Sequence, residues 1–408
     1  MHDHSHPKMR LRRRFIKRVF CTLVVFGLSF YISILLFGNF KGPQIIHLTS
    51  LSRCPACFGV SVCPELYSNQ ILLDFSKWSY VFNAKNIFYG LTRTNRKVVL
   101  KKLAHNWEFD EFDSKICKTW NLSQDCNPNQ LLNVTNVDAK ILDIVNLNLS
   151  WPGEEPRKGL VLCPYSYSLY DLLNPVFYPK RNHKAELLNI WTMLSLNPEP
   201  IILQVIPKSK GWPVPAYGGV CGRLEVVAYE GETLASLNDV TWYKKLKYAQ
   251  KILKAAMDFT FKHDRFRFYL MDWSLDNIVV NDNDVVTFVD LEDVVIVDKN
   301  ILPKRDLPDW YKRYGREQLG PGFTFSIENL CKHHLSDHNL WAACYILAGD
   351  DKPYLYPIPS EANETKPHLY RLLEDCLRNS DDRFKTFTKL QHVIDDLLDS
   401  KLGSNVIR

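Results

Sequence analysis

The sequence predicts an α+β fold in which a small strand-rich lobe precedes a larger helical lobe, because strand patterns dominate the first half of the chain and helical patterns the second. An amphipathic pattern with helical spacing covers residues 242–263, and the last hundred of the 408 residues are mostly of helical type. The strand-like runs are 86–90, 97–103, 223–229, 278–280 and 285–290. The last two runs frame a candidate catalytic segment between the lobes.

The chain begins with a basic tail, residues 1–18, and continues with about twenty uncharged residues, 19–38. The tail carries seven Lys and Arg residues, and without them the net charge of +6 falls close to neutral. No basic stripe or nucleic-acid motif appears later in the chain. We therefore expect no nucleic-acid partner.

The uncharged run has the length that a helix needs to cross ~30 Å of hydrocarbon. Because the cations precede it, the positive-inside rule places the N-terminus in the cytosol and the residues after about 40 in the lumen. We expect a single-pass type II protein of the ER or Golgi, bound to the membrane through this segment. The alternative is a secreted protein from which residues 1–38 are cleaved as a signal peptide, although no A-x-A-like site is visible near Gly38.

A cysteine-bearing stem, residues 39–70, follows the apolar run. Outside that run the chain has ten cysteines, an even number that suits up to five disulfides in an oxidising compartment. Cys54 and Cys57, with Cys63, also resemble half of a zinc site, but no second ligand pair follows at zinc spacing. A redox-active C-x-x-C is a third reading, and the sequence leaves the disulfide pairing open.

We expect residues 71–230 to form the strand-rich lobe and residues 231–408 to form the helical lobe with the catalytic loop. A glycosylated, disulfide-held insertion is expected at about 104–180, and a helix followed by a strand over 182–206. The N-x-[S/T] sequons that suggest glycosylation are at Asn121, Asn133, Asn148 and Asn363.

The chemistry is concentrated in residues 270–280, where Asp272 precedes Asn277 by five positions and a β-branched run follows. Protein kinases hold a catalytic Asp and a metal-binding Asn on a short loop in this way. The carboxylate accepts the proton of the acceptor hydroxyl, and the amide oxygen reaches a divalent metal on the phosphates. Leu270 and Met271 replace the usual His-Arg pair, so activation through a phosphorylated loop is not expected.

Asp290 follows a short strand, 285–289, and lies thirteen residues after Asn277. A metal-chelating Asp occupies this place in kinases, in the triplet D-F-G. Here Glu292 stands in place of the glycine. The alternative is a pair of acidic surface turns between strands.

These features resemble the protein-kinase superfamily, and more closely the divergent protein kinase domain family, second subfamily (the "deleted in autism" group of secretory-pathway proteins). The resemblance covers roughly residues 50–400 and implies a two-lobed protein-kinase-like fold and a Golgi or secreted location. It is carried by segments 54–59, 98–103, 197–204, 211–213, 221–223, 269–280 and 289–299.

The resemblance implies further roles. Lys101, in Val-Val-Leu-Lys, is similar to the lysine that holds the α- and β-phosphates of ATP. Glu186, which opens the helix before the expected strand 201–205, is its implied partner, with Glu108 and Glu111 as rivals nearer in sequence.

The segment from Glu225 through Tyr229 to Leu234 is similar to the hinge that contacts adenine. Asp337 is similar to the Asp at a helix start that supports the catalytic loop. The glycine-rich loop G-x-G-x-x-G, which covers the phosphates in kinases, is missing, because Gly90 is the single glycine of residues 85–97. The Ala-Pro-Glu triplet is missing too.

The implied activity is transfer of a phosphoryl group from ATP, with Mg²⁺ or Mn²⁺, to a lumenal or extracellular protein or glycan. Asp272 would be the base, Asn277 and Asp290 the metal ligands, and Lys101 with Glu186 the phosphate clamp. The alternative is a catalytically weak or inactive pseudokinase that acts as a binding or signalling module, which the missing glycines favour. Transfer of AMP is a third, minor option.

Overall fold

The computed structural model divides the chain into two units, Met1–His47 and Leu48–Arg408, each of which is described by itself. The residues it describes are 22–23, 26–29, 44–74, 86–123, 126–133, 159–163, 168–176, 183–237, 240–300, 313–314, 327–331, 334–349, 353–359, 366–378 and 383–405. The basic tail, residues 1–18, lies outside these ranges.

Among the described residues, no helix has both the length and the apolar character that a membrane crossing requires. This finding contradicts the predicted localisation as a single-pass type II membrane protein. Of the apolar run 19–38, only residues 22–23 and 26–29 are described, as short helical stretches. The rest of the run lies outside the described residues.

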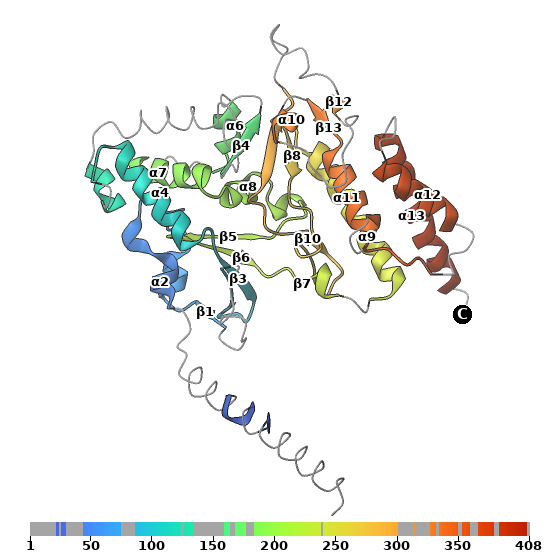
Figure 1. Cartoon of the computed structure of the whole chain (residues 1–408), viewed down its shortest axis with the longest axis horizontal. Coiled ribbons are helices and arrows are strands. Elements are labelled where there is room, and N and C mark those ends of the chain that lie inside the picture. Colours follow the sequence, from blue (N-terminus) through green and yellow to red (C-terminus); the bar gives the residue numbers. More distant parts are fainter. Residues whose placement is uncertain are drawn as a thin grey trace, which may run out of the picture. The chain divides into compact units, whose positions relative to one another are not determined.

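An antiparallel sheet of five strands, in the order β1-β2-β3-β6-β5, is formed by described residues of the second unit (Figure 1). Its strands are β1 (Ile71–Leu73), β2 (Ile87–Thr92), β3 (Lys97–Lys102), β5 (Tyr217–Cys221) and β6 (Leu224–Ala228). The central strand β3 places Lys101 opposite Ile87 of β2 and Glu225 of β6. The strands predicted at 86–90, 97–103 and 223–229 are confirmed to within two residues.

Two small sheets carry the loops of the candidate site. In the first, β11 (Val294–Asp298) pairs antiparallel with β8 (Phe266–Leu270) and parallel with β4 (Val161–Cys163). In the second, β9 (Ile278–Val280) lies between β10 (Val286–Phe288) and β7 (Glu232–Thr233). A further short parallel pair joins β12 (Arg313–Tyr314) to β13 (Leu335–Ser336).

Helices dominate the C-terminal part of the chain, and the α+β class is confirmed. The long helix α9 (Trp242–Met257) begins where the Thr241 hydroxyl accepts a hydrogen bond from the Lys244 N–H at 3.3 Å. It continues as a π-helical turn, Asp258–Lys262, in agreement with the predicted span 242–263. It packs with α11 (His338–Ala348) and α13 (Arg383–Asn405), and α12 (Lys366–Leu377) packs on α11 and α13.

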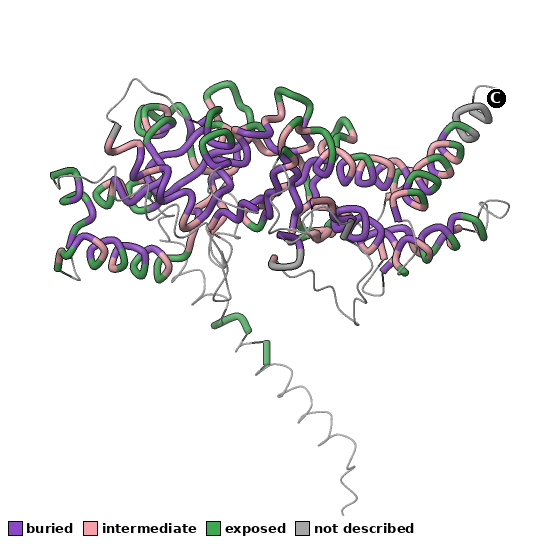
Figure 2. Tube along the Cα trace, turned by 90° about the horizontal axis from the view of Figure 1, so that it is seen from above, coloured by how far each residue is buried: buried purple, intermediate pink, exposed green. Residues whose placement is uncertain are grey.

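Figure 2 shows the resulting burial: the inner trace is buried, whereas outer helices alternate buried and exposed turns. This alternation is the amphipathic pattern from which the helices were predicted.

The strand expected at 201–205 is wrong, because the segment forms the helix α8 (Glu199–Val205). Pro200 lies in its first turn, where a missing N–H costs nothing. Ile201, Ile202 and Leu203 are fully buried, and a short apolar run of this kind does not distinguish strand from helix. The preceding helix, α7 (His183–Ser195), was predicted.

The remaining helices are short, apart from α4. They are α2 (Ile45–Thr49), α3 (Cys63–Tyr67), α4 (Asn106–Thr119), α6 (Leu169–Leu173) and α10 (Ile327–Cys331). The 3₁₀ turns are Leu51–Arg53, Pro128–Asn133, Lys208–Lys210 and Leu234–Ser236.

Ten cysteines form five disulfides within the described residues, as the even count predicted. The pairs are Cys54–Cys57, Cys63–Cys221, Cys117–Cys126, Cys163–Cys331 and Cys344–Cys376. Neither a zinc site nor a redox-active C-x-x-C is therefore needed to account for the cysteines of the stem. The predicted insertion contributes β4 to the sheet of β8 and β11, and its sequon residues Asn121 and Asn133 are exposed. Asn148 and Asn363 lie outside the described residues, and glycosylation and the domain boundaries stay predictions.

Candidate functional site

Two loops that connect the two small sheets form the base of the candidate site. One joins β8 to β9, and the other joins β10 to β11. The Met271 N–H donates to the carbonyl of Asp293 at 2.9 Å, and the Val289 N–H donates to the carbonyl of Asn277 at 2.9 Å. These bonds fix the loops relative to each other and bring the predicted Asp and Asn side chains to one place.

The start of α11 supports the first loop from below. The Asn339 side-chain oxygen accepts the Leu270 N–H at 3.2 Å, and the His338 Nε2–H donates to the Leu270 carbonyl at 2.6 Å. Asp337, the expected brace, is buried and forms an ion pair with Arg383 instead. The supporting role therefore falls to the two residues that follow Asp337.

Asp272 and Asn277 are in direct contact at the surface of the loop. The Asn277 Nδ2 donates to Asp272 Oδ2 at 2.7 Å, which holds the carboxylate in one orientation. Among the described residues, the Asn277 side-chain oxygen has no hydrogen-bond donor, and Asp272 is exposed. The pair thus offers one outward-facing carboxylate and one available amide oxygen.

Lys101 reaches from β3 to two acidic residues. Its Nζ lies 2.7 Å from Glu199 Oε2 and also contacts Asp290 Oδ1. Burial by itself would lower the pKa of Lys101, but the negative charges of Glu199, Asp290 and Glu292 raise it above its ordinary value. Lys101 therefore stays protonated and ties the sheet to the second loop.

The predicted pair between Lys101 and Glu186 is not formed. Glu199, in the first turn of α8, takes that place, and its Oε1 also accepts the Leu291 N–H at 3.3 Å. Glu186 lies on α7 in the wall of a different cavity of about 920 Å³, between α7, α8 and β5. The reason is the chain path: α8 begins beside Lys101, whereas Glu186 lies one helix earlier and faces the other cavity.

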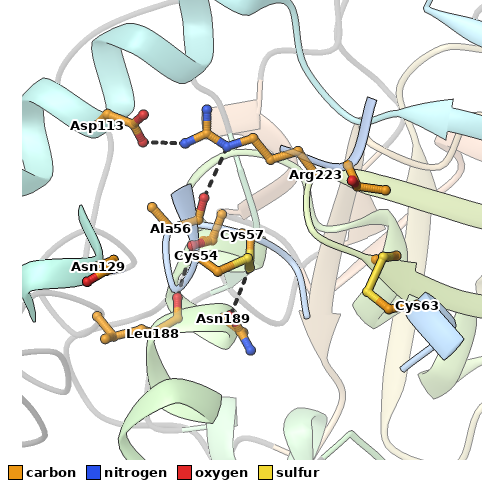
Figure 3. The surroundings of a disulfide bond; sticks show 12 residues. Cys54, Ala56, Cys57, Cys63, Asp113, Asn129, Leu188, Asn189 and Arg223 are labelled. Atoms are coloured by element: carbon orange, nitrogen blue, oxygen red, sulfur yellow. Dashed lines mark hydrogen bonds and ion pairs between the residues drawn. A yellow bond between two sulfur atoms is a disulfide. The ribbon is translucent and has the colours of Figure 1, made fainter. Parts of the chain in front are cut away.

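The two rival residues on α4 do not reach Lys101 either. The Glu108 carboxylate accepts the N–H of His105 at 2.7 Å and caps its own helix, and Glu111 is exposed. The acid that α4 buries is Asp113, which forms an ion pair with Arg223 beside the Cys54–Cys57 disulfide (Figure 3).

Arg223 holds α4 to the stem and to the start of β6. Its Nε donates to the Ala56 carbonyl at 3.2 Å, and its guanidinium lies 4.3 Å from the ring centre of Phe109 (Figure 3 shows the first of these contacts). Burial raises the pKa of Asp113, while the charge of Arg223 opposes that rise. The contact is structural and lies apart from the Lys101 cluster.

Neither predicted hinge residue lines the cleft around Lys101. Glu225 is within β6 and fully buried, and its carboxylate has no hydrogen-bond partner among the described residues. Burial, and then the charge of Glu199, raise the pKa of Glu225 well above its ordinary value. Tyr229 follows β6, and its hydroxyl donates to Glu232 at 2.6 Å.

The second loop adds acidic residues to which the sequence patterns gave no role. Asn197 Nδ2 donates to Glu292 Oε2 at 2.6 Å, and burial raises the pKa of Glu292 to about 7. Burial, and then the charges of Asp290 and Asp272, also raise the pKa of Asp293. Asp290 itself has a left-handed backbone with φ of 65°, a conformation that costs energy in residues other than glycine.

A cleft of about 540 Å³ opens between β3 and the two loops. Its chemically active lining residues are Lys101, Asp272, Asn277, Asp290, Glu292 and Asp293. Within the described ranges, no three His, Cys, Asp or Glu residues are arranged to hold a metal by themselves. This donor set still fits a nucleotide-bound Mg²⁺, which takes one or two protein oxygens and completes its shell with phosphates and water.

The comparisons with known proteins agree with this geometry. Residues 190–379 match the family described as the protein-kinase domain of FAM69. The chain is 32% identical over 387 residues to divergent protein kinase domain 2A of Xenopus tropicalis, covering 85% of this chain and 87% of that protein. The chain belongs to the divergent protein kinase domain family.

Other members of the divergent protein kinase domain family are similar over different lengths. The human 2A protein is 31% identical over 387 residues, which cover 87% of this chain and 88% of that protein. The mouse 2B protein is 24% identical over 266 residues, which cover 61% of this chain and 60% of that protein. The resemblance seen in the sequence is thus confirmed.

The family match includes Glu199, the residue that sequence reasoning missed. The signal was present in Asn197-Pro-Glu-Pro, where a glutamate lies between two prolines just before an apolar run. Asn197 reinforces it, since its Oδ1 accepts the Glu199 N–H at 3.0 Å and its Nδ2 donates to the Leu103 carbonyl at 3.1 Å. In this divergent kinase domain Lys101 thus forms its ion pair with Glu199, a residue in the first turn of α8.

Proposed function

We propose that the chain transfers a phosphoryl group from ATP, with Mg²⁺ or Mn²⁺, to a hydroxyl group of a protein or glycan. One observation carries the proposal: Lys101, Asp272, Asn277 and Asp290 converge on one cleft from a sheet and two loops. Phosphoryl transfer needs few covalent steps from the protein, and most of its catalysis is positioning and charge neutralisation. These four side chains are of the types that such catalysis uses.

Asp272 is suited to accept the proton of the attacking hydroxyl because it is exposed and oriented by Asn277. Lys101 remains positively charged and is suited to contact phosphate oxygens. Asn277 and Asp290 would hold the divalent ion, which neutralises phosphate charge when it is bound. Glu199 keeps the Lys101 ammonium at the edge of the cleft.

The first test is nucleotide binding by the full chain, produced in an oxidising host so that its disulfides form. Thermal unfolding is followed with and without ATP and Mn²⁺, and ATP at a hundred times its Kd stabilises by about 2.7 kcal/mol. We expect the shift in the native chain and its loss in Asp290→Ala. An unchanged melting curve for the native chain contradicts the proposal.

The second test is turnover. Transfer of label from γ-labelled ATP, but not from α-labelled ATP, distinguishes phosphoryl transfer from transfer of AMP. We expect Asp272→Ala to lower the rate by about 10²–10⁴-fold, the contribution of a positioned general base. Normal turnover in this variant contradicts the assigned base.

A specific contact favours a second candidate, a binding module without activity. Lys101 contacts Asp290 directly, so the carboxylate assigned to the metal is already neutralised. The sequence between β1 and β2, residues 75–85, also has no glycine with which to cover phosphates closely. Binding of ATP without turnover, or no binding at all, supports this candidate.

A further inference from the structure

A second cavity, of about 900 Å³, opens on the other side of the catalytic loop. Ser274 and Asp276 line both this cavity and the cleft around Lys101. The two spaces are therefore separated only by the loop that begins with Asp272. A molecule held in the second cavity lies against the loop that carries the proposed base, next to Trp273 and Ser274.

Aromatic side chains form much of the wall. Trp273 comes from the catalytic loop, Tyr345 from α11, and Tyr354 and Tyr356 from the segment after α11. We call this cavity, with these four aromatic residues, the aromatic pocket. Lys245 of α9 completes one side, with its Nζ 5.4 Å from the ring centre of Tyr354.

Packing behind the wall fixes the orientation of the rings. The ring of Trp273 lies edge-on to Phe288 with centres 4.9 Å apart, and the ring of Tyr356 meets Tyr370 at 4.8 Å. Because both aromatic pairs are held by neighbouring elements, the wall is preformed. A preformed wall loses little side-chain entropy when a ligand binds.

Two polar atoms of this wall lack partners among the described residues. They are the hydroxyl of Tyr354, a residue only 5% exposed, and Nε1 of Trp273. Buried hydroxyl and indole N–H groups are normally hydrogen-bonded. Both atoms are buried behind the surface of the wall, so the polar contacts open to a ligand come from other lining residues.

We propose that the aromatic pocket is the acceptor site and that the acceptor is a saccharide. A sugar ring has an apolar C–H face that packs on aromatic rings and a rim of hydroxyls that hydrogen-bond to polar groups. Ser274, Asp276 and Lys245 supply those polar groups. This assignment rests on the phosphoryl-transfer function proposed above and names its substrate class.

The reaction then balances as a single transfer. An acceptor hydroxyl oxygen forms a bond to the γ-phosphorus of ATP, and its proton goes to Asp272. The bond between the γ-phosphorus and the β–γ bridging oxygen breaks, and ADP leaves with that electron pair. The products are a sugar phosphate ester and ADP.

The lining residues favour a saccharide over an extended peptide. One common mode of extended-peptide binding pairs the peptide backbone with an exposed strand edge. The described residues of the pocket wall come from loops, a 3₁₀ turn, α9 and α11, and none belongs to a strand. Among the described lining residues the charged ones are Lys245 and Asp276, which are of opposite sign, so the pocket suits a neutral ligand.

The test uses the fluorescently labelled full chain on an array of neutral and anionic oligosaccharides and, in parallel, on an array of Ser- and Thr-containing peptides. Two variants alter the pocket in different ways: Tyr356→Ala removes a stacking face, and Ala235→Trp fills the space. Tyr170→Ala, an exposed tyrosine on α6, is the matched control. A cooperative thermal unfolding transition shows that each variant is folded, and its shift with ATP and Mn²⁺ is measured separately.

We expect one class of oligosaccharide to be retained, with about tenfold weaker binding in both pocket variants and native binding in the control. Absence of retained saccharide, with the ATP shift intact, overturns the saccharide site and leaves the proposed function standing. Retention that neither pocket variant weakens, or retention of peptides alone, also overturns it. Pocket-dependent saccharide binding without any ATP shift supports the site and contradicts phosphoryl transfer.

Discussion

Lys101 and Glu225 lie directly opposite each other in the ladder between β3 and β6, yet they have contrasting electrostatic states. Lys101 stays charged because it contacts Glu199 and Asp290. Glu225 is fully buried without a hydrogen-bond partner among the described residues, and its pKa is raised. The sheet thus places a carboxyl group with a raised pKa opposite a lysine that stays charged.

Replacement of Glu225 by Gln is expected to stabilise the protein above pH 4.5, the ordinary pKa of Glu. Because burial raises the pKa of Glu225, the folded chain keeps a proton that the unfolded chain loses as the pH rises above 4.5. That difference lowers stability with increasing pH in the native chain, and Glu225→Gln removes it. Urea unfolding at pH 4.5 and 7.5 measures the effect, with Glu111→Gln on the exposed face of α4 as the control. Equal pH dependence in native and variant chains contradicts the raised pKa.

Glu199→Gln is expected to lower the free energy of unfolding by about 1.5–3 kcal/mol, the contribution of a hydrogen bond to a charged group. The amide keeps the shape and can still accept the Leu291 N–H, but it loses the charge that faces Lys101. The ATP-dependent thermal shift should fall as well, because Lys101 is then drawn to Asp290 alone.

Glu186→Gln provides the comparison for Glu199→Gln. Its carboxylate does not contact Lys101, so the thermal shift with ATP and Mn²⁺ should match that of the native chain. A larger loss of nucleotide binding in Glu186→Gln than in Glu199→Gln contradicts the pairing described here.

The sequence was sufficient for the parts of the site that local spacing determines. Asp272 and Asn277 share one loop, and Asp290 follows the next hairpin, so strand patterns alone were enough to place them together. Glu199 is 98 residues from Lys101, and no local pattern specifies that contact. It depends on α8 being a helix rather than a strand, and a buried apolar run does not decide between them.

The orientation of the Glu225 side chain could not be predicted for a different reason, and the hinge role of the segment stays a prediction. The residues of β6 from Leu224 to Val227 are all buried, so the strand lacks the alternation that would have shown which side chains face the cleft. The place of Glu225 inside the predicted strand 223–229 therefore did not show that its side chain is buried.

His338 is expected to make stability fall as the pH drops below 6.5. Burial lowers the pKa of His338 to about 4. Between pH 6.5 and 4 the unfolded chain therefore binds a proton that the folded chain does not bind. The loss over that window is about 3 kcal/mol at 1.36 kcal/mol per pH unit. In His338→Gln the amide can still donate to the Leu270 carbonyl, and this part of the pH dependence should vanish. His392→Gln on the exposed face of α13 is the control, and an unchanged slope in His338→Gln contradicts the assignment.

The two disulfides of the stem are expected to differ in their effect on stability. Cys63–Cys221 closes a loop with a sequence separation of 158, whereas Cys54–Cys57 has a separation of 3. Since a cross-link restricts the unfolded chain more when the loop is longer, the chain-entropy model gives about 5 kcal/mol for the first and about 2 kcal/mol for the second. Double Cys→Ala variants of each pair, compared by urea unfolding, test this order.

Cys63 also joins the stem to β5, so its removal should release the edge of the sheet. Amide exchange that is faster in β5 than in β3 would reveal this release. If loss of Cys54–Cys57 is the more damaging change, the stem is held by local structure and not by its link to the sheet.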